Sequence, residues 1–185
     1  FGLLLVFLLI LGTNLVDRKN FRQVRDSIVT IYEDRLVAKD IIFELFARME
    51  AKNVALLAGD AVQYGQQNRA SDGSISELIE SFRQTKLTRK EARVFSTLEQ
   101  HLAELQVLEK QFAEAEADTR GTLKEKLQIQ LTLVKDDLRS LSKIQIEEGR
   151  RQMFIGKQAV EAVELLTTME IIMLVFIALI VQIAV

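Results

Sequence analysis

Two uncharged apolar stretches lie at the ends of the sequence and enclose a long amphipathic middle. Residues 1–16 and 171–185 carry no charged side chain. Each stretch falls short of the roughly 20 apolar residues that span a bilayer, but both continue to the ends of the sequence. We therefore expect them to be parts of two transmembrane helices, with boundaries at 1–16 and 170–185, and we expect residues 17–169 to form an extracytoplasmic region.

The main alternative for the first stretch is a signal peptide, whose apolar core ends at a small-residue cleavage site. Here the apolar run passes directly into Asp17, Arg18 and Lys19 without such a site. The two stretches instead predict a helical hairpin in the membrane with both outer ends on one side. The positive-inside rule does not decide the orientation, because the flanking loops are outside the sequence.

Between the two stretches, apolar residues recur at spacings of three and four, which is typical of amphipathic and coiled-coil helices. The first row of apolar residues with this spacing, here called a seam, covers residues 21–56. No helix-breaking residue separates it from the first apolar stretch, so we predict one continuous helix that ends within 59–68. A second, short helix is expected from Ser74 or Ser76. An earlier start near Gln63 would match its length better to that of its neighbours.

Local capping signals mark the remaining helices. Thr88 and Glu91 have the spacing of a capping box, which predicts the start of a third helix. We expect residues 118–121 to close that helix, and a fourth to begin at Thr122 or nearby and to continue in register into the last apolar stretch. The predicted fold class is all-α: an antiparallel four-helix bundle continuous with two transmembrane helices.

Composition narrows the possible chemistry. The chain has no Cys, no Pro and one His, so thiolate metal sites are excluded and a catalytic triad could run only through His101. The net charge of −2 gives no reason to expect nucleic-acid binding. No constellation of residues indicates catalysis, and we predict neither enzyme activity, nor a bound metal, nor a cofactor.

A polar layer interrupts the apolar seams of the two long helices. Arg35 lies on the first seam, and Gln145, Glu148 and Gln152 lie on the last. At 1.5 Å per residue these positions have similar heights above the membrane stretches, so we expect an Arg35–Glu148 contact completed by Gln145 or Gln152. Three interpretations stay open: a lock on helix register, a ligand pocket or hinge that lets one helix slide past the other, or two long helices that are not neighbours at that height.

A second polar group is expected toward the distal end of the bundle. Arg48 and Lys52 are one turn apart on the first helix, and Thr132 and Lys135 have similar heights on the fourth. Such a group could hold a carboxylate ligand between helices or across a dimer. A solvated helix face explains the same pattern.

The segment from Ile31 to Leu36 resembles the Tyr-x-Asp-Arg pattern of the four-helix-bundle sensor domain of methyl-accepting chemotaxis proteins, with Tyr32, Asp34 and Arg35 as the matching positions. Ala38 stands where that family often has proline. The resemblance implies a receptor in the bacterial inner membrane, with a periplasmic bundle that senses a small molecule or a partner protein and signals through its last helix. The cytoplasmic signalling hairpin of such receptors is not in this sequence.

Two functions therefore compete. The first is a chemoreceptor-like sensor, expected as a homodimer because Val37, Ile41 and Phe43 offer spare apolar faces. The second is a structural or accessory subunit of a larger inner-membrane complex with no ligand of its own. Membrane lipid is an expected partner in both, and the sequence names no ligand.

Overall fold

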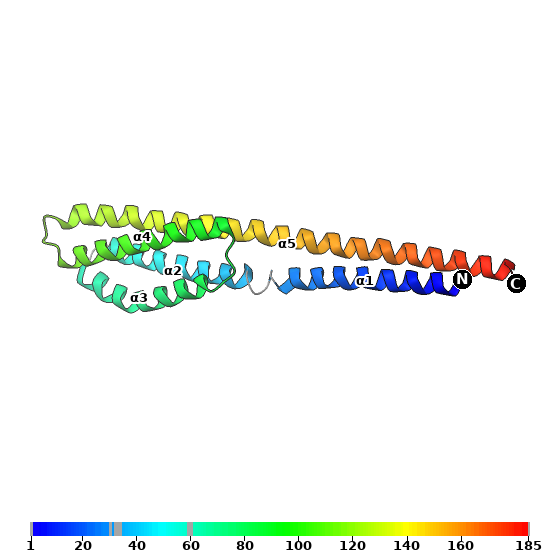
Figure 1. Ribbon diagram of the computed structural model, residues 1–185. Coiled ribbons are helices and arrows are strands. Elements are labelled where there is room, and N and C mark those ends of the chain that lie inside the picture. The colour runs from blue at the N-terminus through cyan, green and yellow to red at the C-terminus, as the bar shows by residue number, and fades with distance from the viewer. Residues whose placement is uncertain (1, 30, 32–34, 59–60, 185) are drawn as a thin grey trace. The chain divides into compact units, whose positions relative to one another are not determined.

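The computed structural model describes residues 2–29, 31, 35–58 and 61–184. Within these residues the chain forms five helices, which are labelled in Figure 1. They are α1 (Gly2–Val29), α2 (Val37–Ala58), α3 (Ala61–Arg83), α4 (Arg89–Glu114) and α5 (Arg120–Ala184). The chain divides into two units, one of Phe1–Tyr32 with Gly149–Val185 and one of Glu33–Glu148.

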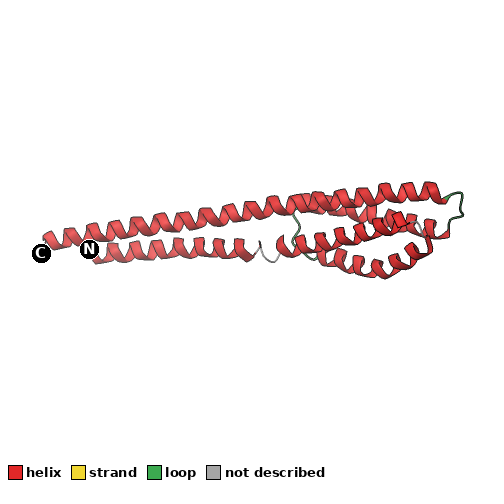
Figure 2. Ribbon diagram, turned by 180° about the vertical axis from the view of Figure 1, so that it is seen from behind, coloured by secondary structure: helices red, strands yellow, loops and turns green. Residues whose placement is uncertain are grey.

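The unit of residues 33–148 is a four-helix bundle. Helices α2, α3 and α4 and the first part of α5 lie side by side in both views of the ribbon (Figure 1, Figure 2). Each contributes a stripe of apolar side chains to one core, as the three-and-four spacing predicted. The largest fully buried apolar side chains are Leu45, Met49, Leu56, Tyr64, Phe82, Leu98, Leu105, Leu127, Leu131, Leu138 and Leu141.

Helix α4 begins where its capping box predicted. The Thr88 hydroxyl accepts a hydrogen bond from the Glu91 N–H at 3.3 Å, and the Glu91 carboxylate accepts one from the Thr88 N–H at 2.6 Å. Two of the backbone donors that every helix N-terminus leaves free are thereby satisfied. The start of α4 is therefore determined by local chemistry.

The predicted short helix from Ser74 or Ser76 is wrong, because α3 begins at Ala61 and includes both residues. Two aromatic contacts hold α3 along α4: Tyr64 meets Phe112 edge-on at 5.7 Å, and Phe82 lies 4.9 Å from Phe95. Burial of these rings outweighs the cost of placing glycines within the helix, about 1 kcal/mol each. The earlier start near Gln63 was the better alternative.

The long rod predicted from the first apolar stretch through residue 56 is described as two helices, α1 and α2. Residues 30 and 32–34 between them are not described, so the motif positions Tyr32 and Asp34 lie outside the described residues. Of the apolar residues assigned to a spare face, Val37 and Phe43 are exposed. Ile41 is not, because it is buried in the bundle core.

The other unit contains α1 and the last part of α5. The two helices approach closely, since a Cβ added at Gly156 would lie 3.5 Å from the Ser27 Cβ. Among the described residues, α5 is the one helix long and apolar enough to cross a membrane, with a mean hydropathy of 2.3 in its most apolar window. The side chains of residues 2–11 are not described, so the first predicted span stays a prediction.

Candidate functional site

A buried ion pair lies at the first turn of α4. Arg35 Nη1 donates to Glu91 Oε1 at 2.6 Å and to Gln145 Oε1 at 3.2 Å. The side chains of Arg35 and Glu91 are 7% and 0% exposed, so the pair is removed from water. Desolvation of both charges is costly, and removing one partner would leave the other charge buried and uncompensated. This layer therefore links Arg35, α4 and α5 through a single guanidinium group.

The carboxylate that binds Arg35 is not the expected one. Our prediction assigned this role to Glu148, whereas Glu91 of α4 provides the carboxylate in the structure. Gln145 does accept a hydrogen bond from Arg35, the role we expected for Gln145 or Gln152. The prediction looked for a partner of Arg35 only on the two long helices. The partner is instead Glu91 at the start of α4, a residue that we had assigned only to the capping box.

Two buried donors of this layer, Arg35 Nε and Gln145 Nε2, have no hydrogen-bond partner among the described residues. A buried donor without an acceptor costs about 1–3 kcal/mol. The layer thus favours an additional acceptor beside these two nitrogens.

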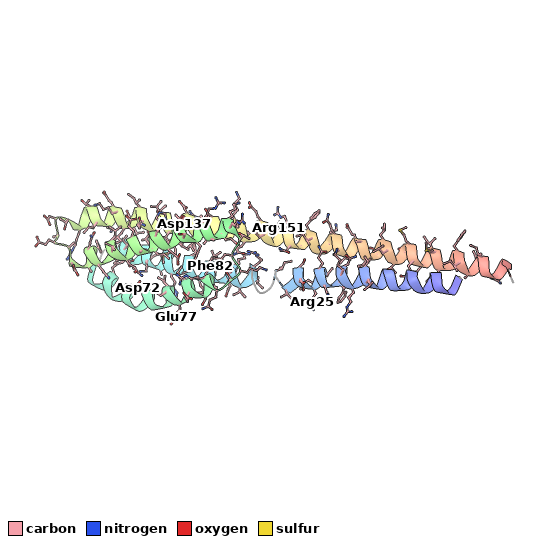
Figure 3. All side chains as sticks on the ribbon, in the orientation of Figure 1. Arg25, Asp72, Glu77, Phe82, Asp137 and Arg151 are labelled. Carbon is pink, nitrogen blue, oxygen red and sulfur yellow. The ribbon has the colours of Figure 1, made fainter. Side chains whose placement is uncertain are left out.

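A second buried charged cluster lies in α2, α3 and α4. Lys52 Nζ donates to both carboxylate oxygens of Glu109 at 2.9 Å and to Asp72 Oδ1 at 2.8 Å, while the Tyr64 hydroxyl donates to Glu109 Oε1 at 3.0 Å. Figure 3 labels Asp72 on α3. Burial raises the pKa of Glu109, and the nearby Asp72 charge adds to this effect, against the opposing action of Lys52 and Tyr64.

A pocket of about 520 Å³ opens beside this cluster, between α3 and α4. Asp72 and Glu109 form part of its wall, together with Gln106 and Ala113 of α4. Gly65 of α3 also lines the pocket, where a Cβ would lie 3.8 Å from the Ala113 Cβ. The volume is within the range of small-molecule sites, and the described lining is mainly polar.

The four positions predicted as a distal ligand group do not come together among the described residues. Lys52 is buried and bound by Glu109 and Asp72, whereas Arg48 and Thr132 are exposed. The Thr132 hydroxyl donates to the Gln128 carbonyl of its own helix.

Lys135 has a different partner, because it donates to Glu50 of α2 at 3.1 Å. This hydrogen bond and the charge of Lys135 hold the pKa of Glu50 below its ordinary value. Lys52 is thus the one member of the predicted group that belongs to the buried cluster.

The single histidine is not an ordinary surface residue. His101 is 25% exposed, and its Nδ1 lies 2.6 Å from Asp137 Oδ2 of α5, which Figure 3 labels. Its backbone carbonyl accepts a hydrogen bond from Gln130 Nε2 at 2.9 Å. These contacts join α4 to α5, so His101 has a structural role in the bundle.

Glu91 and Glu109 are the buried carboxylates of the two clusters, and our sequence reasoning did not assign them to either cluster. Both occupy the apolar seam of α4: Glu91 precedes Phe95 by four residues, and Glu109 lies between Leu105 and Phe112 at the same spacing. A charged residue on a buried seam needs a partner of opposite charge. The apolar stripe of α4 contained this signal, because both residues interrupt it at core spacing.

A comparison with known protein families identifies the family to which the chain belongs. Residues 1–153 match the family described as the four-helix-bundle sensory module for signal transduction. The match covers most of the chain, and the chain belongs to this family of sensory signalling modules. The resemblance inferred from Tyr32, Asp34 and Arg35 is therefore confirmed at the level of the family. A comparison with curated proteins gives no match.

Proposed function

We propose that the chain is a membrane-anchored sensor that detects a small molecule or partner protein at its bundle and passes the signal through α5. The observation that carries this proposal is the continuity of α5. The helix provides Leu127, Leu131 and Leu138 to the bundle core and, without interruption, ends in the apolar stretch 171–184. A displacement of one helix is a common way to couple distant sites.

The proposed location is the bacterial inner membrane, with the bundle on its periplasmic side. Sensory modules of this family are typically extracytoplasmic, which supports that orientation. Large apolar side chains of the last stretch are exposed on the described surface, including Ile172 at 64% and Phe176 at 64%. Exposed apolar surface of this kind suits contact with lipid.

The pocket between α3 and α4 is the proposed ligand site. A small polar molecule in the pocket would form hydrogen bonds with Gln106 and Asp72. Asp72 is 36% exposed and already binds Lys52, so the ligand would compete with Lys52 for this carboxylate. A ligand that changed the Lys52 contacts would act directly on α2, α3 and α4, because the cluster draws on all three helices. The pocket is therefore well placed to alter packing of the bundle.

The test is a thermal-unfolding screen of the intact protein in detergent against a library of small polar metabolites. A compound that binds the folded state raises the melting temperature, and the rise grows with the logarithm of its concentration once that concentration exceeds its Kd. The rise should be lost in Ala113→Phe, which fills the pocket, and kept in Ala103→Phe, a matched change on an exposed position of α4. Equal loss in both variants, or a full rise in Ala113→Phe, would contradict the site.

The accessory-subunit function remains the second candidate, and exposed apolar residues on α2 favour it. Phe43, Val54 and Leu57 are 69%, 61% and 56% exposed. The same surface suits the homodimer proposed for a sensor. Native mass spectrometry of the gently extracted protein separates these proposals: a homodimer supports the sensor, whereas a stoichiometric complex with another integral protein supports the accessory role.

A further inference from the structure

Helices α1 and α5 form an open groove with a cationic wall in the unit of residues 1–32 and 149–185. The groove has a volume of about 570 Å³. Arg18, Lys19 and Arg22 line it from α1, whereas Gln152 and Ile155 line it from α5. Gln23 and Leu15 of α1 also line it, so the lining combines positive charge with two amide and two apolar side chains.

The positive charge of this groove is not balanced by its own lining. Asp26 is the one carboxylate among the described residues that line it, and Arg25 donates to that carboxylate at 3.0 and 3.2 Å. Figure 3 labels Arg25 on α1. Arg18, Lys19 and Arg22 are exposed and make no ion pair with a described residue. The groove thus presents three cations that no carboxylate of the described side chains pairs with.

The cations lie directly after the uncharged stretch of α1, which ends at Val16. At 1.5 Å per residue, Arg18 and Arg22 are about 3 Å and 9 Å farther along the helix. The headgroup layer on each side of the hydrocarbon core is about 5–8 Å thick. A helix anchored through residue 16 therefore places these cations at the depth of the lipid phosphates.

We propose that this groove binds the headgroup of an anionic phospholipid. The phosphate is held by Arg18, Lys19 and Arg22, because guanidinium and ammonium groups are strong phosphate donors. Gln152 offers hydrogen bonds to a polar headgroup, and Ile155 contacts its apolar part. The location next to an apolar helix favours a lipid over a free anion. This inference rests on the membrane anchoring proposed above.

The experiment measures lipid binding to the intact protein in detergent by native mass spectrometry. Phosphatidylglycerol is titrated against zwitterionic phosphatidylcholine. Each cation near an anionic headgroup raises the binding affinity by up to about fivefold. We therefore expect the protein to bind phosphatidylglycerol at least about tenfold more tightly than phosphatidylcholine, and we expect this preference to decline as the salt concentration increases. The triple variant Arg18→Gln, Lys19→Gln and Arg22→Gln should bind both lipids equally.

The matched control removes the same number and type of cations from exposed positions outside the groove. Arg89→Gln, Arg93→Gln and Lys126→Gln should keep the preference for phosphatidylglycerol. Equal lipid binding in the wild type, or an unchanged preference in the groove variant, would overturn the proposal. Saturation by inorganic phosphate with no preference between the lipids would identify a free-anion site and also overturn it.

Failure of the lipid site can be separated from failure of the membrane anchor. Alkaline carbonate extraction of cell membranes reports anchoring without reference to lipid type. A protein that stays in the membrane and shows no preference for phosphatidylglycerol overturns only the groove. A protein released by carbonate overturns the proposed anchoring, and with it the reason to expect a lipid in the groove.

Discussion

At the scale of single residues, Glu91 has two roles at once. Its carboxylate accepts a hydrogen bond from the backbone N–H of Thr88, the residue that caps α4, and it also forms an ion pair with the buried Arg35. One side chain therefore determines a helix start and a tertiary contact. Such coupling makes Glu91 a sensitive position, because a substitution affects local and long-range structure together.

Arg35→Met is expected to destabilise the protein by about 3 kcal/mol, because it leaves the Glu91 charge buried without a partner. Adding Glu91→Gln should recover part of this loss, since glutamine keeps the capping hydrogen bond and has no charge. Denaturant unfolding of the two variants measures the difference. Arg83→Met, which removes an exposed arginine paired with Glu80 and Glu99, should have a smaller effect.

If the double variant is no more stable than Arg35→Met, the buried pair does not act as a unit. A similar loss for Arg83→Met and Arg35→Met would also contradict the argument from burial. Both outcomes are measurable because the chain has no cysteine whose oxidation could complicate unfolding.

Glu109 should make the free energy of unfolding fall as pH rises, which is the opposite of the usual effect of a paired carboxylate. Burial raises its pKa in the folded protein, so the folded state holds the proton more tightly than the unfolded chain does. Ionising Glu109 therefore costs folding free energy, and this cost grows as pH rises from its ordinary pKa near 4.5 to the raised value. The stability of wild type relative to Glu109→Gln should fall as pH increases through this window.

Glu50 provides the control of opposite sign. Its pKa is lowered by the hydrogen bond from Lys135, so its stabilising contribution is present above the ordinary pKa and is lost as pH falls through the lowered one. The stability of wild type relative to Glu50→Gln should therefore rise with pH. Unfolding of the three proteins between about pH 2.5 and pH 8 tests both directions, because the Glu50 window lies below its ordinary pKa. The same slope for both substitutions would contradict the assignment.

At the scale of elements, α1 and α5 approach each other closely at Ser27 and Gly156. A Cβ at Gly156 would lie 3.5 Å from the Ser27 Cβ, the separation found across disulfides. The variant Ser27→Cys with Gly156→Cys should therefore form an intramolecular disulfide on mild oxidation. Its faster migration on a non-reducing gel, reversed by reductant, is the measurement.

The control shifts one cysteine by one residue. Ser27→Cys with Lys157→Cys should cross-link poorly, because Lys157 is exposed and a step of one residue turns the side chain about 100° around the helix. Comparable cross-linking of both pairs would show that α1 and α5 are not held in the described register. A cross-link at the mass of two chains would show contact between copies instead.

At the scale of the whole molecule, α5 belongs to both units of the chain. Its residues 120–148 contribute to the bundle, and residues 149–184 accompany α1 in the other unit. The family match extends across the division, from residue 1 to residue 153. The proposed ligand pocket lies in one unit and the proposed lipid groove in the other, so their separate tests report on different parts of the protein.

The presence of helices and the start of α4 could be predicted from the amino-acid sequence alone. The apolar spacing of three and four depends only on the geometry of the helix, and the capping box depends on residues three positions apart. Arg35 and Gln145 were identified for the same reason, since a polar residue on an apolar seam stands out locally. The family was recognised from a short motif and the arrangement of apolar stretches.

The sequence by itself therefore determined the helices, their buried faces and the polar residues that needed partners. Tertiary structure alone decided which partners these were: Glu91 rather than Glu148 for Arg35, and Glu109 with Asp72 for Lys52. It also decided that α3 begins at Ala61, through the packing of Tyr64 on Phe112. The physical reason is range: helix periodicity and capping act within a few residues, whereas ion pairing and ring packing depend on which distant segments meet.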